Sequence, residues 1–434
     1  MGKKYFFVSK NPVTKKSVKK GGTMNKKMTA IIAAAILVTL GFGIAIGQHV
    51  CRINYKKKVH KISVAELDNG DHQLLIAGKP YFIKGVCYIP TPIGKGYDYD
   101  LWSDTTKPWL VDGKLMKDMG VNTVRFYFHS KNAELGREVI KEFYEKFGIR
   151  SALGHYLNFW DYPPPNYALP EVRARIRQGV IKMVNDYKDE PGILCWILGN
   201  ENNYSFDRNV NAWTTDEIDL IEDPQEQRNA KARIYYKFVN DLAKEIKSID
   251  SNHPVVIGNG ELASIEIAGE LCTDVDILGG IIYTGKTFGS FWKRLKRNFG
   301  KPAVMIEFGC DRYNAFTQKE DEDYQALFIK TQWQEIEKNS AGGTGEGNSL
   351  GGFVFEWNDE WWKYNEQYPG DWKVQNVEAS WSNGSYYFDA KADSNMNEEW
   401  WGIVGLTNEG AGDIERRIPK KSYYILKDLW KKRR

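Results

Sequence analysis

Short apolar runs alternate with helical patterns along most of this chain, and this alternation constrains the fold more than any other feature. The run ILCWIL at 193–198 is apolar throughout, as in a parallel strand covered on both faces. Stretches such as 170–188 and 224–249 repeat apolar residues at helical spacing. Eight strands joined by seven or eight helices close most economically into a (β/α)8 barrel. The predicted strands are 81–89, 122–128, 149–157, 193–198, 253–260, 275–283, 302–309 and 351–358.

Two segments lie outside this α/β pattern. Residues 62–80 read as a small hairpin with a turn at Asn69-Gly70. Residues 364–418 form a long insertion after the eighth strand, rich in aromatic and polar residues. We therefore predict one TIM-barrel domain over 62–434 that carries this insertion.

The first 61 residues have a different composition, typical of a membrane anchor. Residues 1–28 contain nine Lys and no acid, and 29–47 contain no charge. About 17–25 apolar residues suffice to cross a bilayer as a helix, and a basic flank stays in the cytoplasm. We predict a cytoplasmic tail at 1–28, a transmembrane signal anchor at 29–47 and a basic juxtamembrane spacer at 48–61. The alternative is a signal peptide cleaved near Gln48, which would release a secreted protein.

Charge and metal-binding residues exclude several classes of function. Without the Lys-rich tail the chain carries 51 basic and 56 acidic residues, so no nucleic-acid footprint is indicated. The five Cys form no CxxC pair and the six His are dispersed, so the sequence predicts no disulfide framework, metal site or cofactor.

Two glutamates stand at the ends of predicted strands four and seven. Glu201 follows ILCWIL in the motif GNE, and Glu307 ends the run PAVMIE. In a (β/α)8 barrel both carboxyl groups project into the mouth at the C-terminal ends of the strands. Two carboxyl groups across a pocket are what cleavage of a glycosidic bond requires, one as a proton donor and one as a nucleophile or base. The simpler alternative is a pair of surface-loop acids.

These motifs resemble those of clan A of the retaining glycoside hydrolases. The stretch IAGKPYFIKGVCYIP at 76–90 is similar to the entry strand of the family 2 catalytic barrel, and also to the family 72 glucanosyltransferases. VNTVRFY at 121–127 resembles the second-strand motif of the clan. The resemblance implies that Glu201 is the acid/base and Glu307 the nucleophile. It also implies that Arg125 supports the nucleophile and that Asn200 holds the sugar 2-hydroxyl.

Three further side chains are candidates for contact with substrate. By the same resemblance Tyr283 hydrogen-bonds the nucleophile and Trp357 forms the aromatic floor of the sugar site. His155 closes the third predicted strand, where contact with substrate and a purely structural role are both open. Aromatic residues at strand ends often only pack. For Arg125 the alternative is a salt bridge at the barrel mouth, with Glu307 as a candidate partner, and this alternative is compatible with support of the nucleophile.

The sequence therefore predicts a retaining glycoside hydrolase or transglycosylase that acts on a β-linked polysaccharide outside the cytoplasmic membrane. Hydrolysis and transfer use the same residues and differ only in the acceptor. A non-catalytic carbohydrate-binding envelope protein is the alternative, although a pure binder has no need for both glutamates. A metal-dependent hydrolase or an aldolase is disfavoured by the lack of a His/Asp cluster or a Lys at a strand end.

Overall fold

The structure is a computed structural model that describes residues 58–208, 210–364, 368–378, 396–409 and 414–432. The chain separates into two units, Met1–Lys57 and Lys58–Arg434, and the second contains the described residues. The predicted tail and transmembrane anchor, with most of the spacer, lie outside the described residues. No helix within the described ranges is long and apolar enough to cross a membrane.

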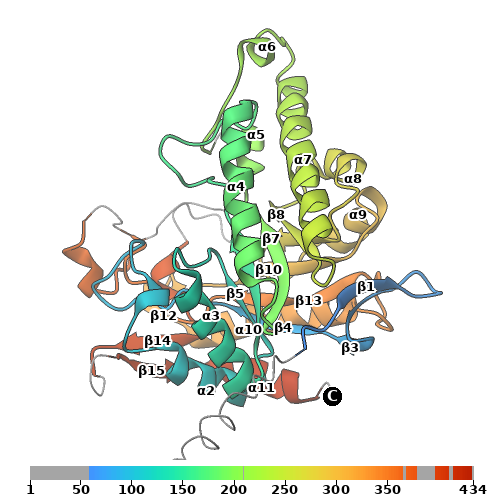
Figure 1. The fold of residues 1–434 in the computed structure, drawn as a ribbon. Coiled ribbons are helices and arrows are strands. Elements are labelled where there is room, and N and C mark those ends of the chain that lie inside the picture. Colours follow the sequence, from blue (N-terminus) through green and yellow to red (C-terminus); the bar gives the residue numbers. More distant parts are fainter. Residues whose placement is uncertain (1–57, 209, 365–367, 379–395, 410–413, 433–434) are drawn as a thin grey trace, which may run out of the picture. The chain divides into compact units, whose positions relative to one another are not determined.

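Eight parallel strands close into a barrel, which confirms the predicted (β/α)8 architecture (Figure 1). Around the barrel the order is β10-β13-β4-β5-β6-β7-β8-β9. Consecutive barrel strands are therefore neighbours, and the last strand, β13, pairs with the first, β4, to close the barrel. Strands β11 and β12 form a separate two-stranded sheet between β10 and β13 in the sequence. The strands are β4 (Ile83–Cys87), β5 (Thr123–Phe126), β6 (Arg150–His155), β7 (Ile193–Leu198), β8 (Val255–Gly260), β9 (Ile277–Ile281), β10 (Ala303–Gly309) and β13 (Ser349–Phe355).

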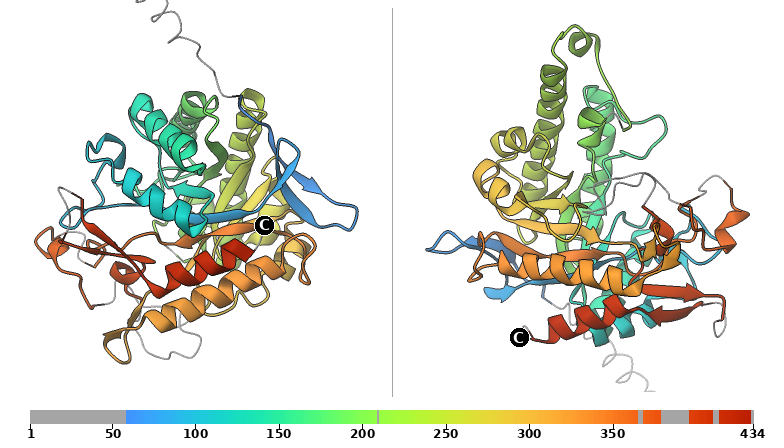
Figure 2. Two further views of the ribbon diagram at one scale, coloured as in Figure 1. Left: turned by 90° about the horizontal axis from the view of Figure 1, so that it is seen from below. Right: turned by 180° about the vertical axis from the view of Figure 1, so that it is seen from behind.

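A helix follows each barrel strand and covers its outer face. Local signals set their ends: Asp223 caps α7 by accepting from the backbone N–H of Gln225, and Gly148, in a left-handed conformation, follows the turn that extends α3. Helices α4 and α7 lie side by side (Figure 1), as do α10 and α11 (Figure 2). The helices are α2 (Trp109–Met119), α3 (Ala133–Glu142) with the π-helical η2 (Phe143–Phe147), α4 (Pro170–Tyr187), α7 (Pro224–Ile249), α8 (Ile265–Leu271), α9 (Phe291–Asn298), α10 (Glu322–Lys338) and α11 (Lys421–Lys432).

The predicted hairpin is present and lies at the N-terminal end of the barrel strands. Strands β1 (Ile62–Glu66) and β2 (His72–Ile76) pair antiparallel, and β3 (Lys79–Tyr81) extends this sheet. The Tyr81 hydroxyl donates to the carbonyl of Asn122, just before β5, over 2.8 Å. Short elements complete the described chain: η1 (Leu101–Ser103), α5 (Tyr204–Asp207), α6 (Asp216–Asp219), β11 (Tyr313–Asn314) and β12 (Lys319–Glu320).

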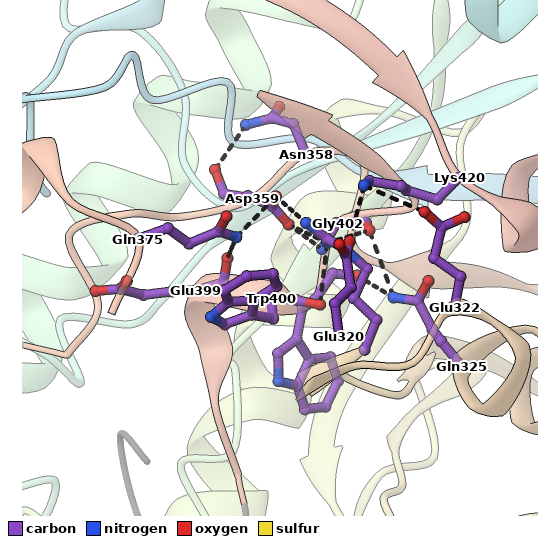
Figure 3. A network of polar contacts seen from close by, with 12 residues as sticks. Glu320, Glu322, Gln325, Asn358, Asp359, Gln375, Glu399, Trp400, Gly402 and Lys420 are labelled. Atoms are coloured by element: carbon purple, nitrogen blue, oxygen red, sulfur yellow. Dashed lines mark hydrogen bonds and ion pairs between the residues drawn. The ribbon is translucent and has the colours of Figure 1, made fainter. Parts of the chain in front are cut away.

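The described parts of the insertion after β13 are fastened to the barrel by a buried arginine. Arg312 Nη2 lies 2.5 Å from Asp359 Oδ2, and Arg312 Nη1 donates to the carbonyls of Trp400 and Gly402 over 3.2 and 3.0 Å. Figure 3 shows Asp359, Trp400 and Gly402 within this polar network. A guanidinium that satisfies both a buried carboxylate and backbone carbonyls fixes the chain on either side. The elements here are η3 (Asp371–Lys373), η4 (Glu398–Trp400), β14 (Val404–Thr407) and β15 (Arg416–Pro419).

Side chains along the strands alternate between the barrel interior and the layer under the helices. Cys87, Ala152 and Cys195 belong to the interior cluster, whereas Val86 and Leu153 belong to the cluster between strands and helices. This alternation has a period of two, as in any strand. It therefore decides which of the predicted site residues can reach the mouth of the barrel.

Candidate active site

Glu307 on β10 is the centre of a buried hydrogen-bond network inside the barrel. Its Oε1 accepts from Arg125 Nη1 and from the Tyr127 hydroxyl, each over 2.7 Å. Its Oε2 accepts from the Tyr283 hydroxyl over 2.8 Å. Glu307 is 6% exposed, so these donors replace most of the water that a carboxylate needs around it. The arrangement suits a carboxylate that works in its ionised form.

Arg125 on β5 connects this strand to β10 and to the segment just after β7 through its buried guanidinium. Besides Glu307 it donates through Nη1 to the carbonyl of Ile306 over 2.9 Å and through Nη2 to Asn200 Oδ1 over 2.5 Å. Its guanidinium carbon also lies 4.0 Å from the centroid of the Tyr127 ring. One rigid cation therefore fixes Glu307 relative to the Asn200 side chain. The salt bridge between Arg125 and Glu307, which the sequence offered as an alternative role for Arg125, is present.

Glu201 lies just past β7, where the chain turns sharply. Gly199 has φ +81° and Glu201 has φ +59°, in the left-handed region that non-glycine residues seldom occupy. The backbone N–H of Asn200 donates to Asn202 Oδ1 over 2.6 Å, and Asn202 Nδ2 donates to the Tyr167 hydroxyl over 2.7 Å. These bonds hold a strained backbone, a feature that concentrates at functional sites.

The surroundings of Glu201 favour its protonated form. Burial and, after it, the negative charge of Glu307 raise the pKa of Glu201 to about 8, against the opposing effect of a hydrogen bond from Tyr204. Below about pH 8 Glu201 therefore carries a proton that it can donate. A carboxyl group that keeps its proton, across from one that accepts three hydrogen bonds, is the arrangement expected of an acid paired with a nucleophile or base.

Two predicted site residues lie elsewhere, on the side of the strands that faces the helices. His155 stacks on His129 with ring centroids 5.8 Å apart, and its Nδ1 accepts from the backbone N–H of Leu157 over 3.0 Å. Burial lowers the pKa of His155 to about 4, so it packs as a neutral ring against α4, the structural role that the sequence left open. Trp357 is fully buried, and its ring lies 6.2 Å from that of Tyr423 on α11.

Two aromatic residues that the sequence did not single out join the site instead. Tyr127 donates to Glu307, and it stands two residues after Arg125 on the same face of the strand, which is a signal that alternation carries. The ring centroid of Trp401, within the insertion, lies 4.8 Å from that of Tyr283 and 5.0 Å from that of Phe355. No local pattern connects Trp401 to these rings, because the contact depends on how the insertion returns to the barrel.

A second pair of carboxyl groups lies at the end of β13. Glu356 and Glu360 are both fully buried, and Lys363 Nζ lies 3.7 Å from Glu360 Oε2 and 3.3 Å from Glu398 Oε2. Burial, together with the adjacent Glu360, raises the pKa of Glu356 well above its ordinary value. Glu356 therefore keeps its proton in the folded protein at pH values where it ionises in the unfolded chain. Across the described ranges no three His, Cys, Asp or Glu residues are arranged to hold a metal ion.

Glu356→Gln should therefore stabilise the protein at neutral and higher pH. Because the pKa of Glu356 is raised in the folded protein, the free energy of unfolding falls as the pH rises above the ordinary pKa of a glutamate. The amide of Gln does not titrate, so the variant lacks this pH dependence. We expect the variant to gain about 1–3 kcal/mol near pH 8 and little near pH 5. Thermal unfolding at both pH values measures this, with the exposed Glu66→Gln as the control. An equal change at both pH values would contradict the assignment.

Comparisons with known proteins show that this barrel is shared with enzymes acting on sugars. No family model matches the chain. A "Beta-galactosidase" of Leuconostoc mesenteroides subsp. mesenteroides is 25% identical over 165 residues, which are 38% of this chain and 15% of that protein. The fold is similar to the "GH2 beta-galacturonidase from Eisenbergiella tayi bound to galacturonate", with 16% identity and a TM-score of 0.52 over 86% of this chain and 54% of the other.

A second similar structure is "Bacteroides uniformis beta-glucuronidase 2 covalently bound to cyclophellitol-6-carboxylate aziridine". It has 16% identity and a TM-score of 0.58 over 86% of this chain and 38% of the other. At these identities the likeness shows the fold, a barrel of the type found in family 2 glycoside hydrolases. The chain spans about half the length, or less, of the proteins that it matches. The resemblance to family 72 stays a prediction.

Proposed function

We propose that this chain is a retaining glycoside hydrolase or transglycosylase that acts on a β-linked polysaccharide by double displacement. The observation that carries the proposal is the contrast between two glutamates at the barrel mouth. Glu307 is held by Arg125, Tyr127 and Tyr283, while burial and Glu307 keep Glu201 protonated. The glycosidases with similar barrels support the same class of reaction.

The proposed reaction divides the roles between these two side chains. A Glu307 oxygen attacks the anomeric carbon, and the bond to the leaving oxygen breaks as Glu201 gives that oxygen its proton. Glu201, now ionised, then takes a proton from water or from a sugar hydroxyl. The oxygen of that acceptor replaces Glu307 at the anomeric carbon, so both carboxyl groups return to their starting states. Asn200, held by Arg125, is the proposed partner of the sugar 2-hydroxyl.

The proposal includes a location outside the cytoplasmic membrane. The uncharged residues 29–47, behind a tail with nine Lys and no acid, support a single-pass anchor. Secretion after cleavage remains the alternative. N-terminal sequencing of the protein from its native host distinguishes them, since a cleaved chain begins near Gln48 and an anchored chain keeps residues 29–47.

The test of the reaction uses the full-length protein in detergent. It is incubated with 4-nitrophenyl β-glycosides of galactose, glucose, mannose and glucuronic acid, and with β-linked oligosaccharides, and products are sized by mass spectrometry. Shorter products indicate hydrolysis, and products longer than the starting material indicate transfer. Binding of an oligosaccharide without turnover of any compound would contradict the enzyme and favour a carbohydrate-binding protein.

The tyrosines on Glu307 provide a further prediction. Tyr127→Phe and Tyr283→Phe each remove one hydrogen bond to a charged group, which contributes about 1.5–3 kcal/mol. We expect kcat to fall roughly 10- to 100-fold in each variant. Tyr424→Phe, on an exposed part of α11, is the control. Wild-type kcat in both site variants would show that these hydroxyls do not support the nucleophile.

A further inference from the structure

Exposed aromatic side chains gather on the loops at one end of the barrel. Among the described residues seven aromatic side chains are exposed, and six of them follow the C-terminal ends of barrel strands. The seventh, Tyr424, lies on α11. A single exposed aromatic ring is ordinary, but several on one face indicate a binding surface, and here they follow the strand ends that also carry Glu201 and Glu307. The six are Tyr97, Phe128, Trp160, Tyr162, Phe316 and Tyr368.

A row of ring contacts leads from the proposed nucleophile to one of these side chains. Tyr127 donates to Glu307, and its ring centroid lies 5.9 Å from that of Tyr156. The Tyr156 ring in turn lies 6.4 Å from that of Phe128, which is 39% exposed. The interplanar angles of these two contacts are 35° and 39°, so the planes are tilted by similar amounts. Phe128 is therefore connected to the reaction centre through two tyrosine rings.

Trp160 presents a second ring on the loop after the adjacent strand β6. It is 55% exposed, and it packs edge-on against the fully buried Phe159 with ring centroids 4.9 Å apart. The Phe159 backbone is fixed on both sides: its N–H donates to the Tyr156 carbonyl over 3.2 Å, and its carbonyl accepts from Asn211 Nδ2 over 2.9 Å. The indole is thus exposed but mounted on an ordered support, as binding residues require.

We propose that Phe128 and Trp160 form a stacking site for sugar rings beyond the ring that is cleaved. This inference rests on the proposed function and deepens it. The chain then acts on substrates of several β-linked sugars, and single-sugar glycosides are poor substrates. The apolar C–H faces of pyranose rings stack on flat aromatic faces, which offer large contact area with little loss of side-chain entropy.

The kinetic test compares two substrates of the sugar accepted in the panel. They are its 4-nitrophenyl glycoside with one sugar ring and the corresponding glycoside with four. We expect kcat/KM to be higher for the longer substrate, and the ratio of the two values to fall about 3- to 10-fold in Phe128→Ala and in Trp160→Ala. Tyr424→Ala, at an aromatic side chain on α11 that is 53% exposed, should keep the wild-type ratio. An unchanged ratio in both site variants overturns the inference.

A binding test separates this inference from the proposed reaction. Glu307→Gln, with and without Trp160→Ala, is run on native gels that contain a mixed-linkage β-glucan, a β-1,4-galactan or a β-1,4-glucomannan. Retardation that is lost with Trp160→Ala supports the stacking site, even if the wild-type protein shows no turnover. No retardation in any gel overturns the stacking site, even if single-sugar glycosides are cleaved.

Discussion

Glu307→Gln is expected to lower kcat by about 10⁴-fold or more, a larger effect than that of Glu201→Ala or of either tyrosine variant. An amide cannot form the ester that links the sugar to the enzyme in the double displacement. The substitution keeps the size of the side chain and an oxygen that can accept from Arg125, Tyr127 or Tyr283. The loss of rate is therefore attributable to chemistry rather than to a change of shape.

The same variant should also be less stable, because it leaves the buried Arg125 without its counter-ion. Arg125 is 1% exposed, and removing one partner of a buried ion pair costs up to about 3–5 kcal/mol. Circular dichroism must therefore show a folded protein at the assay temperature before kcat is interpreted. Glu66→Gln, at an exposed position of β1, is the matched control for both measurements. A folded Glu307→Gln protein that retains more than about one per cent of wild-type kcat would contradict its role as nucleophile.

Glu201→Ala should lower kcat by about 10²- to 10⁴-fold for substrates with poor leaving groups. It should affect 2,4-dinitrophenyl glycosides much less in the first step, because that leaving group needs no proton. The second step still lacks a base, so azide, which needs none, should accelerate turnover of the variant and yield a glycosyl azide. Absence of both effects in a folded variant would assign the acid/base to another residue.

The wild-type pH profile provides an independent check on Glu201. Because burial and Glu307 raise the pKa of Glu201 to about 8, its proton is present below that pH and lost above it. The value of kcat/KM should therefore stay high through neutral pH and decrease at alkaline pH, with an apparent pKa near 8 for this alkaline limb. In Glu201→Ala this limb should disappear. An identical limb in the variant would show that a different group titrates.

Much of the barrel was predictable because its signals are local. Eight apolar runs with helical patterns between them predict the strands, and alternation along VNTVRFY places Arg125 and Tyr127 on one face. The hydrogen bond from Tyr283 to Glu307 was predictable because parallel barrel strands end on the same side of the barrel. Helix α8 was not predicted, because its seven residues give too few turns for a clear periodicity.

Other side chains lie where the local sequence pattern did not predict them. The strand β13 ends at Phe355, so Trp357 lies beyond the regular alternation, and its ring packs on α11 rather than in the mouth. His155 does lie on a strand, but on the face opposite to Ala152 and Tyr156, so alternation already opposed its contact with substrate. Trp401 and the raised pKa of Glu201 depend on contacts between distant segments, which no window of sequence contains.

The most direct test of the account is to trap the glycosyl-enzyme. The full-length protein is incubated with the 2-deoxy-2-fluoro 2,4-dinitrophenyl β-glycoside of the sugar it accepts, because fluorine slows the second step more than the activated first step. Intact mass spectrometry should show one added fluorosugar, and peptide mapping should place it on Glu307, with no adduct in Glu307→Gln. A stable adduct on another side chain, or steady turnover of normal substrate with inversion and no adduct, would contradict the central claim.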